Sequence, residues 1–362
     1  MTPKRILIFC PWAYSTSYYT AQYCNAVASE QNKIFLIAPK NFLSDLLAEN
    51  VEQVNWPYIS PFRTNISSLL QTPGQLVRFI KIINKIRPDW IHLLWKHHLP
   101  ILLKPYLKKF KIGYTVHDPV LHSGESGFFR SWVQKKLIEM ADILLVHGEN
   151  NRKNLIQNFD IDTGKIYQIS HGNVFFWNHI PDIEQENIIL FFGRIKKYKG
   201  LEILLKSFKK AEPQLPGYRL VIRGQGDPAD VSSIIKSMPN VDFENRFVLH
   251  NEVPELFARA KFVVLPYLDG TQSGVVPMAF AFGRTCIVSS VGSIPEVINN
   301  GENGLLVPPG DVNALADRIS LLSSDDRLRK KLEKGAFSTS EQIDAEYQKS
   351  IFNIITKAYC DK

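Results

Sequence analysis

Short apolar runs, rich in β-branched and aromatic residues, recur along the whole chain and alternate with amphipathic stretches. In the first half these runs are RILIFC, KIFLIA, WIHLLW, IGYTVH, ILLVHG and IYQISH. In the second half they are IILFFG, YRLVIRG, FVVLPY, TCIVSS and GLLVPP. Continuous apolar strands separated by helical stretches such as LEILLKSFKKA and NALADRISLLSS are typical of parallel sheets covered on both faces. The alternation therefore predicts an α/β chain with two doubly wound domains.

A proline and an acidic run interrupt this alternation at 175–187, in FFWNHIPDIEQEN. Such residues mark loops, so we expect the linker between the two domains there. The chain has 362 residues, which is long enough for two domains of about 150–200 residues each. We place the N-terminal domain at 1–178 and the C-terminal domain at 179–339, and a final helix at about 340–361 could belong to either.

Composition indicates a cytoplasmic protein. No apolar run approaches the roughly 20 residues of a membrane-spanning helix, and RILIFC is too short for the core of a signal peptide. The four cysteines, Cys10, Cys24, Cys286 and Cys360, lack the spacing of a metal site. We therefore expect buried free thiols, with neither disulfides nor zinc.

The net charge of +8 is concentrated in the first half of the chain. Residues 1–180 contain 20 Lys and Arg against 12 Asp and Glu, whereas residues 181–362 contain 23 of each. Segment 72–113 alone has nine cations against one carboxylate, Asp89. Within it QLVRFIKIINKI has apolar residues at helical spacing, and KPYLKKFK follows.

This pattern favours an anionic membrane surface or an acidic substrate over nucleic acid. A solvated helix face remains the alternative. The lysines that we expect to form a membrane or acceptor patch, called the basic patch below, are Lys104, Lys108, Lys109 and Lys111.

The stretch LPYLDGTQSGVVPMAFAFG, at 265–283, places small and polar residues between an apolar strand and an apolar helix. A strand ending at Gly270 and a helix beginning near Ser273 would direct free N–H groups outward, which suits an anion. A plain helix cap by Thr271 or Ser273 explains the turn equally well.

Two cations follow another predicted strand, in FFGRIKKYKGLE. Arg194 comes directly after Gly193, and Lys199 precedes the next helix. The helix dipole disfavours a cation there by about 0.3–1 kcal/mol, so an anionic ligand is a natural reason for both, and Arg can hold a phosphate by two hydrogen bonds. Surface solvation is the alternative. In VIRGQGDP, Gly224 permits close backbone approach, although an ordinary turn explains it equally well.

Taken in order, these motifs resemble those of the GT-B glycosyltransferases, and specifically of glycosyltransferase family 4. The resemblance covers about 188–315 and rests on FFGRIKKYKGLEILLKSF, VIRGQGD, ELFARAKFVVLPY, TQSGVVPMAFAFGRTCIVSSVGSIPEVI and GENGLLVPPGD. YTVHDP and ISHGN make the first half similar in a looser way. The family's fold implies two Rossmann-like domains facing a central cleft, an N-terminal one for the acceptor and a C-terminal one for a nucleotide-sugar donor. The family's final helix usually crosses back to the first domain.

The resemblance also implies roles for matching residues. The TQSG turn is similar to a loop whose amides receive the donor's phosphates and stabilise the departing nucleoside diphosphate, so that no metal is required. The YTVHDP motif matches a histidine loop beside the transferred sugar. The catalytic candidates are His117, Asp118 and Asp269. The donor-binding candidates are Gly193, Arg194, Lys199, Gly224, Thr271, Gln272, Ser273, Gly274 and Glu296.

One departure from the family's pattern concerns its two glutamates, which many members carry seven residues apart around this turn. Here the second falls on Met278 or Ala279, so that carboxylate is absent. The first falls on Asp269, Gly270 or Thr271, of which Asp269 is the best candidate, and Glu296 matches another recurrent family position. The resemblance therefore implies a variant site, in which ribose binding and the identity of the donor are affected.

We accordingly expect a hexosyltransferase that moves a sugar from a nucleoside-diphosphate sugar to a glycan or lipid-linked acceptor, with retention. We expect it to act in cell-surface polysaccharide or glycolipid synthesis on the inner face of the membrane, without a cofactor. A GT-B sugar-nucleotide epimerase and a non-catalytic sugar-nucleotide-binding protein remain alternatives, and the basic segment argues against the epimerase. A nicotinamide dehydrogenase is disfavoured because no GxGxxG follows the first strand.

Overall fold

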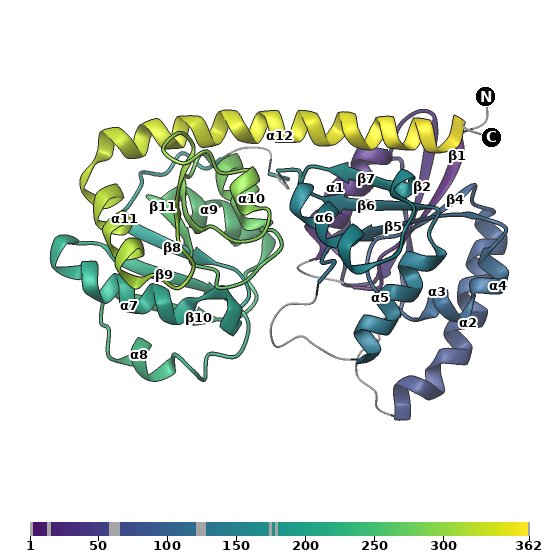
Figure 1. Cartoon of the computed structure of the whole chain (residues 1–362), viewed down its shortest axis with the longest axis horizontal. Helices are drawn as coiled ribbons and strands as arrows, with labels where there is room; N and C mark the ends of the chain where they lie inside the picture. Colours follow the sequence, from purple (N-terminus) through teal and green to yellow (C-terminus); the bar gives the residue numbers. More distant parts are fainter. Residues whose placement is uncertain are drawn as a thin grey trace. The chain divides into compact units, whose positions relative to one another are not determined.

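The computed structural model describes residues 3–12, 16–57, 66–120, 128–173, 176–177 and 180–360, apart from the side chains at 66–71 and 356–360. The chain divides into two compact units (Figure 1). The first unit is Met1–Gly172 together with Glu346–Lys362, and the second unit is Asn173–Ala345.

The described part of the first unit has a seven-stranded sheet in the order β3-β2-β1-β4-β5-β6-β7. All of its pairings are parallel. Its strands are β1 (Lys4–Phe9), β2 (Asn32–Pro39), β3 (Val51–Trp56), β4 (Trp90–Leu93), β5 (Lys111–Val116), β6 (Ile143–His147) and β7 (Ile166–Ile169). Its helices are α1 (Ser17–Val27), α2 (Ile66–Ile86), α3 (Leu99–Leu102), α4 (Lys104–Leu107), α5 (Phe128–Met140) and α6 (Glu149–Asn158).

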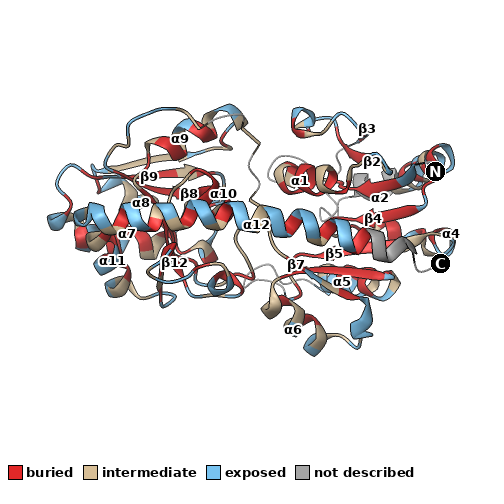
Figure 2. Ribbon diagram, turned by 90° about the horizontal axis from the view of Figure 1, so that it is seen from above, coloured by how far each residue is buried: buried red, intermediate tan, exposed pale blue. Residues whose placement is uncertain are grey.

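The described part of the second unit has a six-stranded parallel sheet in the order β10-β9-β8-β11-β12-β13. Its strands are β8 (Ile188–Phe192), β9 (Arg219–Gly224), β10 (Val241–Asn245), β11 (Phe262–Leu265), β12 (Cys286–Ser289) and β13 (Gly304–Val307). Its helices are α7 (Leu201–Ala211), α8 (Ser232–Lys236), α9 (Val253–Arg259), α10 (Val275–Ala281) and α11 (Val312–Ser324). The strands of both sheets are largely buried (Figure 2). The two doubly wound domains expected from the sequence are thus confirmed.

In both sheets the strand order reverses beside the first strand. β1 pairs with β2 on one side and β4 on the other, and β8 pairs with β9 and β11. In parallel α/β sheets, ligands bind beyond the carboxyl ends of the strands at such a reversal. The loops after these strands are therefore the places at which to look for a site in each unit.

The sequence did not predict β3 and β10. Each lies at an edge of its sheet, and each is only partly buried, with polar residues between the apolar ones. An edge strand has one open side, so it does not need the continuous apolar run by which the central strands were found.

The boundary between the units falls after Gly172, which is ahead of the expected position at residue 178. Trp177 explains the difference. Its ring stacks on His250 at 4.7 Å and packs against Phe282 at 5.1 Å, and its Nε1 donates to the carbonyl of His250 at 3.1 Å. These contacts tie the start of the expected linker to the second unit.

The final helix is longer than expected. α12 runs continuously over Asp326–Cys360, whereas the sequence predicted a helix from about residue 340. The helix starts in the second unit, and its residues from Glu346 onward belong to the first unit. Buried and exposed bands alternate along it (Figure 2). The buried positions recur at helical spacing and include Leu332, Ala336, Ser340, Tyr347 and Ile351.

The amphipathic stretch QLVRFIKIINKI forms part of α2, but its apolar side is used inside the protein. Phe79, Ile83 and Ile86 are buried in the core of the first unit. They are therefore not free to enter a lipid surface, contrary to one interpretation of the sequence. Among the described helices, none is both long and apolar enough to cross a membrane.

Three of the four cysteines are buried free thiols, namely Cys10, Cys24 and Cys286. Burial raises the pKa of each thiol, which keeps it protonated and unreactive. The side chain of Cys360 lies outside the described residues.

Candidate functional site

In the second unit, the loops after β8 and β11 flank the strand-order reversal. Gly193 follows β8 with φ of +136°, a backbone conformation that favours glycine. Leu268, in the loop after β11, donates its N–H to the carbonyl of Tyr198 at 2.8 Å. The two loops are thus joined directly at the carboxyl edge of the sheet.

A network of two tyrosines connects the expected donor-binding cations to the expected anion turn. Arg194 donates from Nη2 to the hydroxyl of Tyr198 at 3.0 Å. The ammonium group of Lys199 lies 5.2 Å from the centre of the Tyr198 ring and 3.6 Å from the centre of the Tyr267 ring. The Tyr267 hydroxyl in turn lies 3.2 Å from Ser273 Oγ. Arg194, Lys199 and Ser273 are therefore brought together.

Two glycines allow neighbouring backbone segments of this site to approach each other closely. Gly200 has φ of +69°, and a Cβ there would lie 1.8 Å from the carbonyl oxygen of Pro266. A Cβ on Gly224 would lie 1.7 Å from the carbonyl oxygen of Gly193. A glycine is therefore required at position 224 for the close approach to Gly193, and this requirement explains the residue without a ligand.

The turn between β11 and α10 begins its helix slightly later than expected, at Val275 with Gly274 as the N-cap. Ser273 Oγ accepts from the Val275 N–H at a long 3.3 Å. Thr271 is buried, and its carbonyl accepts from the N–H of Ser293 at 2.9 Å. The side-chain oxygen of Gln272 is buried and has no hydrogen-bond partner among the described residues. The turn thus contains both a helix-cap contact, at Ser273, and a buried side-chain oxygen without a hydrogen-bond partner among the described residues, at Gln272.

The remaining second-unit candidates surround this turn. Ser293, which contacts Thr271, begins the turn that leads to Glu296, and Glu296 is exposed. Asp269 is half-buried in the loop itself. Met278 and Ala279, where the family's second glutamate would fall, are both buried on α10. Their burial agrees with apolar side chains at these positions.

In the first unit, His117 directly follows β5 at the carboxyl edge of the sheet. Its ring stacks on Trp95, with 3.9 Å between ring centres, and its Nε2 lies 2.9 Å from the carbonyl oxygen of Leu94. A carbonyl only accepts, so Nε2 carries the proton and Nδ1 is the acceptor. Burial lowers the pKa of His117 to about 4, although Asp118 opposes this effect. His117 is therefore a neutral imidazole at physiological pH.

Further aromatic groups surround His117. Tyr19 of α1 lies with its ring centre 4.8 Å from that of His117 and 5.2 Å from that of His147. His147 Nδ1 donates to the carbonyl of Ser170, so its Nε2 accepts from the Tyr19 hydroxyl at 2.9 Å. His171 lies 5.1 Å from His147 between ring centres. Burial is the main cause that lowers the pKa of both these histidines.

Asp118 is positioned through its backbone. Gln134 of α5 is buried, and its Nε2 donates to the carbonyls of Asp118 at 2.8 Å and Pro119 at 3.0 Å. Its Oε1 accepts from Lys96 Nζ at 2.8 Å. Gln134 thus holds the backbone directly after His117 in place. It is a positioning residue for the catalytic candidates and not itself a catalytic candidate.

The basic patch lies away from these groups. Lys108 and Lys109 are exposed and precede β5, and Lys111 begins that strand. They therefore lie toward the amino end of β5, whereas His117 follows its carboxyl end. Lys109 also lies 4.1 Å from the centre of the Tyr106 ring. The four lysines therefore lie away from the strand end that His117 follows, and their role as a membrane or acceptor patch stays a prediction.

Several residues of both sites were not singled out from the sequence. Tyr198 and Tyr267 in the second unit, and Trp95, His147 and His171 in the first, all follow or end a strand. Attention to loops after strands would have found them, but their mutual contacts could not have been inferred. Within the described residues there is no group of three or more His, Cys, Asp or Glu side chains that could hold a metal ion.

Both halves of the chain match models of known glycosyltransferase families. The profile of "Glycosyltransferase Family 4" matches residues 16–172, and that of "Glycosyl transferases group 1" matches residues 186–325. Solved GT-B structures match the whole chain. Its fold is that of the GT-B glycosyltransferases, and each half matches a glycosyltransferase family. The resemblance seen in the sequence is thus confirmed at the level of this group.

Among relatives of this GT-B chain is the N-acetyl-alpha-D-glucosaminyl L-malate synthase of Bacillus anthracis, 25% identical over 238 residues. That match covers 60% of the chain and 61% of the relative, so the chain spans less than two thirds of its length.

Sucrose-phosphate synthase from Thermosynechococcus elongatus has a similar structure, with a TM-score of 0.80 and 20% identity over 99% of this chain and 100% of that one. HepE of Anabaena, in complex with UDP and glucose, gives a TM-score of 0.75 and 15% identity over 99% of each chain. Both likenesses establish the fold alone.

Proposed function

We propose that the chain transfers a hexosyl group from a nucleoside-diphosphate sugar to a glycan or lipid-linked acceptor, with retention of configuration. One observation carries this proposal. Arg194 and Lys199 are joined through Tyr198 and Tyr267 to the turn at Ser273, beside the strand-order reversal where α/β sheets bind ligands. Two cations together with a polar turn suit a diphosphate.

The chemistry follows from these groups. The bond between the sugar's anomeric carbon and the diphosphate oxygen breaks, and the acceptor oxygen bonds to the same face of that carbon. The leaving phosphate takes the acceptor's proton. Negative charge accumulates on the diphosphate as its bond breaks, so Arg194 and Lys199 stabilise the transition state more than the bound donor. The remainder of the catalysis is orientation of the two substrates.

His117 contributes as a neutral group in this scheme. A ring with Nε2–H held by a carbonyl presents Nδ1 as an acceptor, so it can receive a hydrogen bond from a hydroxyl of the transferred sugar. Its stacking on Trp95 fixes the direction of that nitrogen. With a pKa lowered to about 4, His117 does not serve as a general acid at neutral pH.

UDP is the nucleotide that we propose for the donor, because HepE, which shares the fold, was solved with UDP and glucose. We place the reaction in cell-surface polysaccharide or glycolipid synthesis, at the inner face of the membrane. The charge of segment 72–113 supports that placement.

A second candidate function is that of a non-catalytic sugar-nucleotide-binding protein. It is favoured by the absence of a carboxylate at Met278 and Ala279, both of which are buried apolar positions. Such a protein would bind the donor through the same cations without transferring the sugar.

Screening of nucleotide sugars by thermal shift, followed by assays of donor hydrolysis, tests both candidates. A ligand at 100 times its Kd adds about 2.7 kcal/mol to the free energy of unfolding. A glycosyltransferase should be stabilised by UDP and should slowly hydrolyse one UDP-sugar without an acceptor. Tight donor binding with neither hydrolysis nor transfer would favour the binding protein. No stabilisation by any nucleotide sugar would contradict both.

A further inference from the structure

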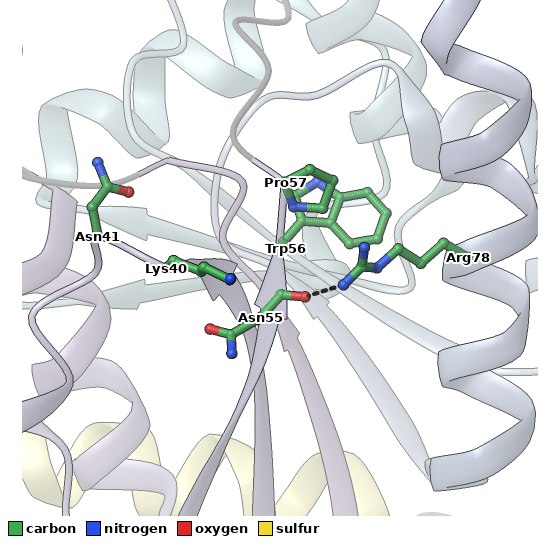
Figure 3. A pocket seen from close by; sticks show the side chains of 6 residues that line it. All are labelled: Lys40, Asn41, Asn55, Trp56, Pro57 and Arg78. Carbon is green, nitrogen blue, oxygen red and sulfur yellow. Dashed lines mark hydrogen bonds between the residues drawn. The ribbon is translucent and has the colours of Figure 1, made fainter.

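A pocket of about 300 Å³ opens in the first unit at the carboxyl ends of β2 and β3 (Figure 3). In the sheet, Pro39 at the end of β2 pairs with Trp56 at the end of β3. The residues that line the pocket are Lys40, Asn41, Asn55, Trp56, Pro57 and Arg78. None of these residues belongs to the candidate site around His117.

The aromatic wall of the pocket is rigid. Trp56 is buried, and its ring packs edge-on against Phe9 at 5.8 Å and Phe79 at 5.9 Å between ring centres. The Arg78 guanidinium lies 5.9 Å from the centre of the same ring. Its Nη2 donates to the carbonyl oxygen of Asn55 at 2.9 Å, as Figure 3 shows. Arg78 is thus held at the pocket by two contacts.

The pocket is positively charged. Within the described part of the chain, neither Lys40 nor Arg78 forms an ion pair with a carboxylate. The guanidinium has five N–H donors, of which the Asn55 contact occupies one. The side chains of Asn41 and Asn55 add amide groups that can donate or accept. An anion would therefore find two cations and further donors around a cavity with one apolar wall.

We propose that this pocket binds the phosphate or carboxylate of an acidic sugar or polyol, and that this anionic group belongs to the acceptor. A guanidinium and an ammonium group hold the charge, the carboxamides bind hydroxyls, and the apolar face of the sugar packs on the exposed Pro57, beside the buried Trp56. The assignment of the ligand as the acceptor rests on the proposed function, whereas the binding of an acidic sugar does not.

The position of the pocket constrains the acceptor. β2 and β5 are three strand spacings apart in the sheet, which corresponds to about 14 Å at roughly 4.8 Å per strand. The anionic group would thus lie well away from a hydroxyl that reacts near His117. It would contribute remote binding energy that orients the acceptor for transfer. The acceptor is therefore an extended molecule with its charge away from the reacting end.

Ligand-observed NMR titration with D-glucose 6-phosphate and D-glucuronate, against D-glucose, tests this proposal. The titration uses the Arg194→Gln protein, so that an anion bound by the cations of the second unit does not contribute. We expect at least one of the two acids to bind saturably and about tenfold or more tighter than glucose. Lys40→Gln and Arg78→Gln should each weaken that binding by about tenfold.

Lys81→Gln is the matched control, because Lys81 is an exposed cation on the same helix as Arg78 and does not line the pocket. It should bind the acid as the parent protein does. Lys40→Gln should leave the fold intact, because Lys40 is exposed and forms no ion pair with another described residue. Acids that bind no tighter than glucose, or that bind both pocket variants unchanged, would overturn the proposal. Stabilisation by UDP is measured separately, so failure of the donor site is distinguishable from failure of the pocket.

Discussion

The ammonium group of Lys199 lies 3.6 Å from the centre of the Tyr267 ring. Tyr267 is buried near the start of the loop that follows β11, and its hydroxyl lies 3.2 Å from Ser273 Oγ. The negative face of the ring therefore holds the cation at the loop that we assign to the donor's phosphates. This contact connects the packing of the second unit to its proposed chemistry.

Loss of the Tyr267 ring should weaken donor binding. A cation–π contact contributes about 0.5–2 kcal/mol, so Tyr267→Leu should raise the Kd of UDP by roughly 2- to 30-fold. Tyr267→Phe keeps the ring and loses only the contact with Ser273, and it should remain near the parent value. Isothermal titration calorimetry measures both. Equal loss in the two variants would show that the hydroxyl, and not the ring, is important.

Arg194→Ala and Lys199→Ala should each reduce donor-dependent activity while the protein stays folded. Each variant removes a charge-assisted contact of roughly 1.5–3 kcal/mol, which corresponds to a loss of about 10- to 150-fold in kcat/KM. Lys197→Ala is the matched control, because Lys197 is an exposed neighbour in the same loop. Near-normal turnover in both test variants would refute the phosphate assignment.

His117 should contribute equally to the rate across the neutral pH range. Burial lowers its pKa to about 4 from an ordinary value of 6.5, so the folded protein keeps the ring neutral above about pH 5. Loss of one hydrogen bond in His117→Ala should lower kcat by about 2- to 13-fold. We expect the ratio of parent to variant rates to stay constant from pH 5.5 to pH 8. A ratio that approaches one below pH 6.5 would mean that His117 titrates normally.

Activity should be independent of metal ions. The reason is that cations and backbone amides are proposed to stabilise the leaving diphosphate in place of a metal. Turnover should therefore be unchanged by EDTA, measured against a parallel assay with added Mg²⁺. Activity that EDTA abolishes and that Mg²⁺ or Mn²⁺ restores would contradict this prediction.

The basic patch should bind anionic lipid in a salt-sensitive way. Each Lys near such a surface contributes about 1 kcal/mol, and the attraction fades beyond a Debye length of about 8 Å at physiological ionic strength. Replacement of all four lysines by Gln should release the protein from anionic vesicles in cosedimentation. The lysines replaced are Lys104, Lys108, Lys109 and Lys111.

Thermal stability and UDP binding serve as controls for this variant, because the patch lies toward the amino end of β5, away from the candidate site in the first unit. A variant that still cosediments with the vesicles would show that the lysines form only a solvated face. Absence of binding by the unmodified protein would point to the same conclusion.

The central strands were predictable from the sequence because a strand covered on both faces needs an unbroken apolar run. β3 and β10 were not, since at an edge of the sheet polar residues are tolerated. Trp177 shows a similar limit. Its place beside a proline and an acidic run indicates a linker, but the partner of its ring, His250, lies 73 residues further along the chain.

The sequence by itself determined the α/β class, the two units and the motifs that carry Arg194, Lys199 and His117, because strand burial, turn chemistry and motif order are local properties of the chain. Only the tertiary structure decided which groups meet. The contact of Lys199 with Tyr267, the neutral state of His117 against Trp95, and the pocket between Lys40 and Arg78 all join segments that are distant in sequence. Such pairs depend on strand order and loop packing, which single-residue patterns do not encode.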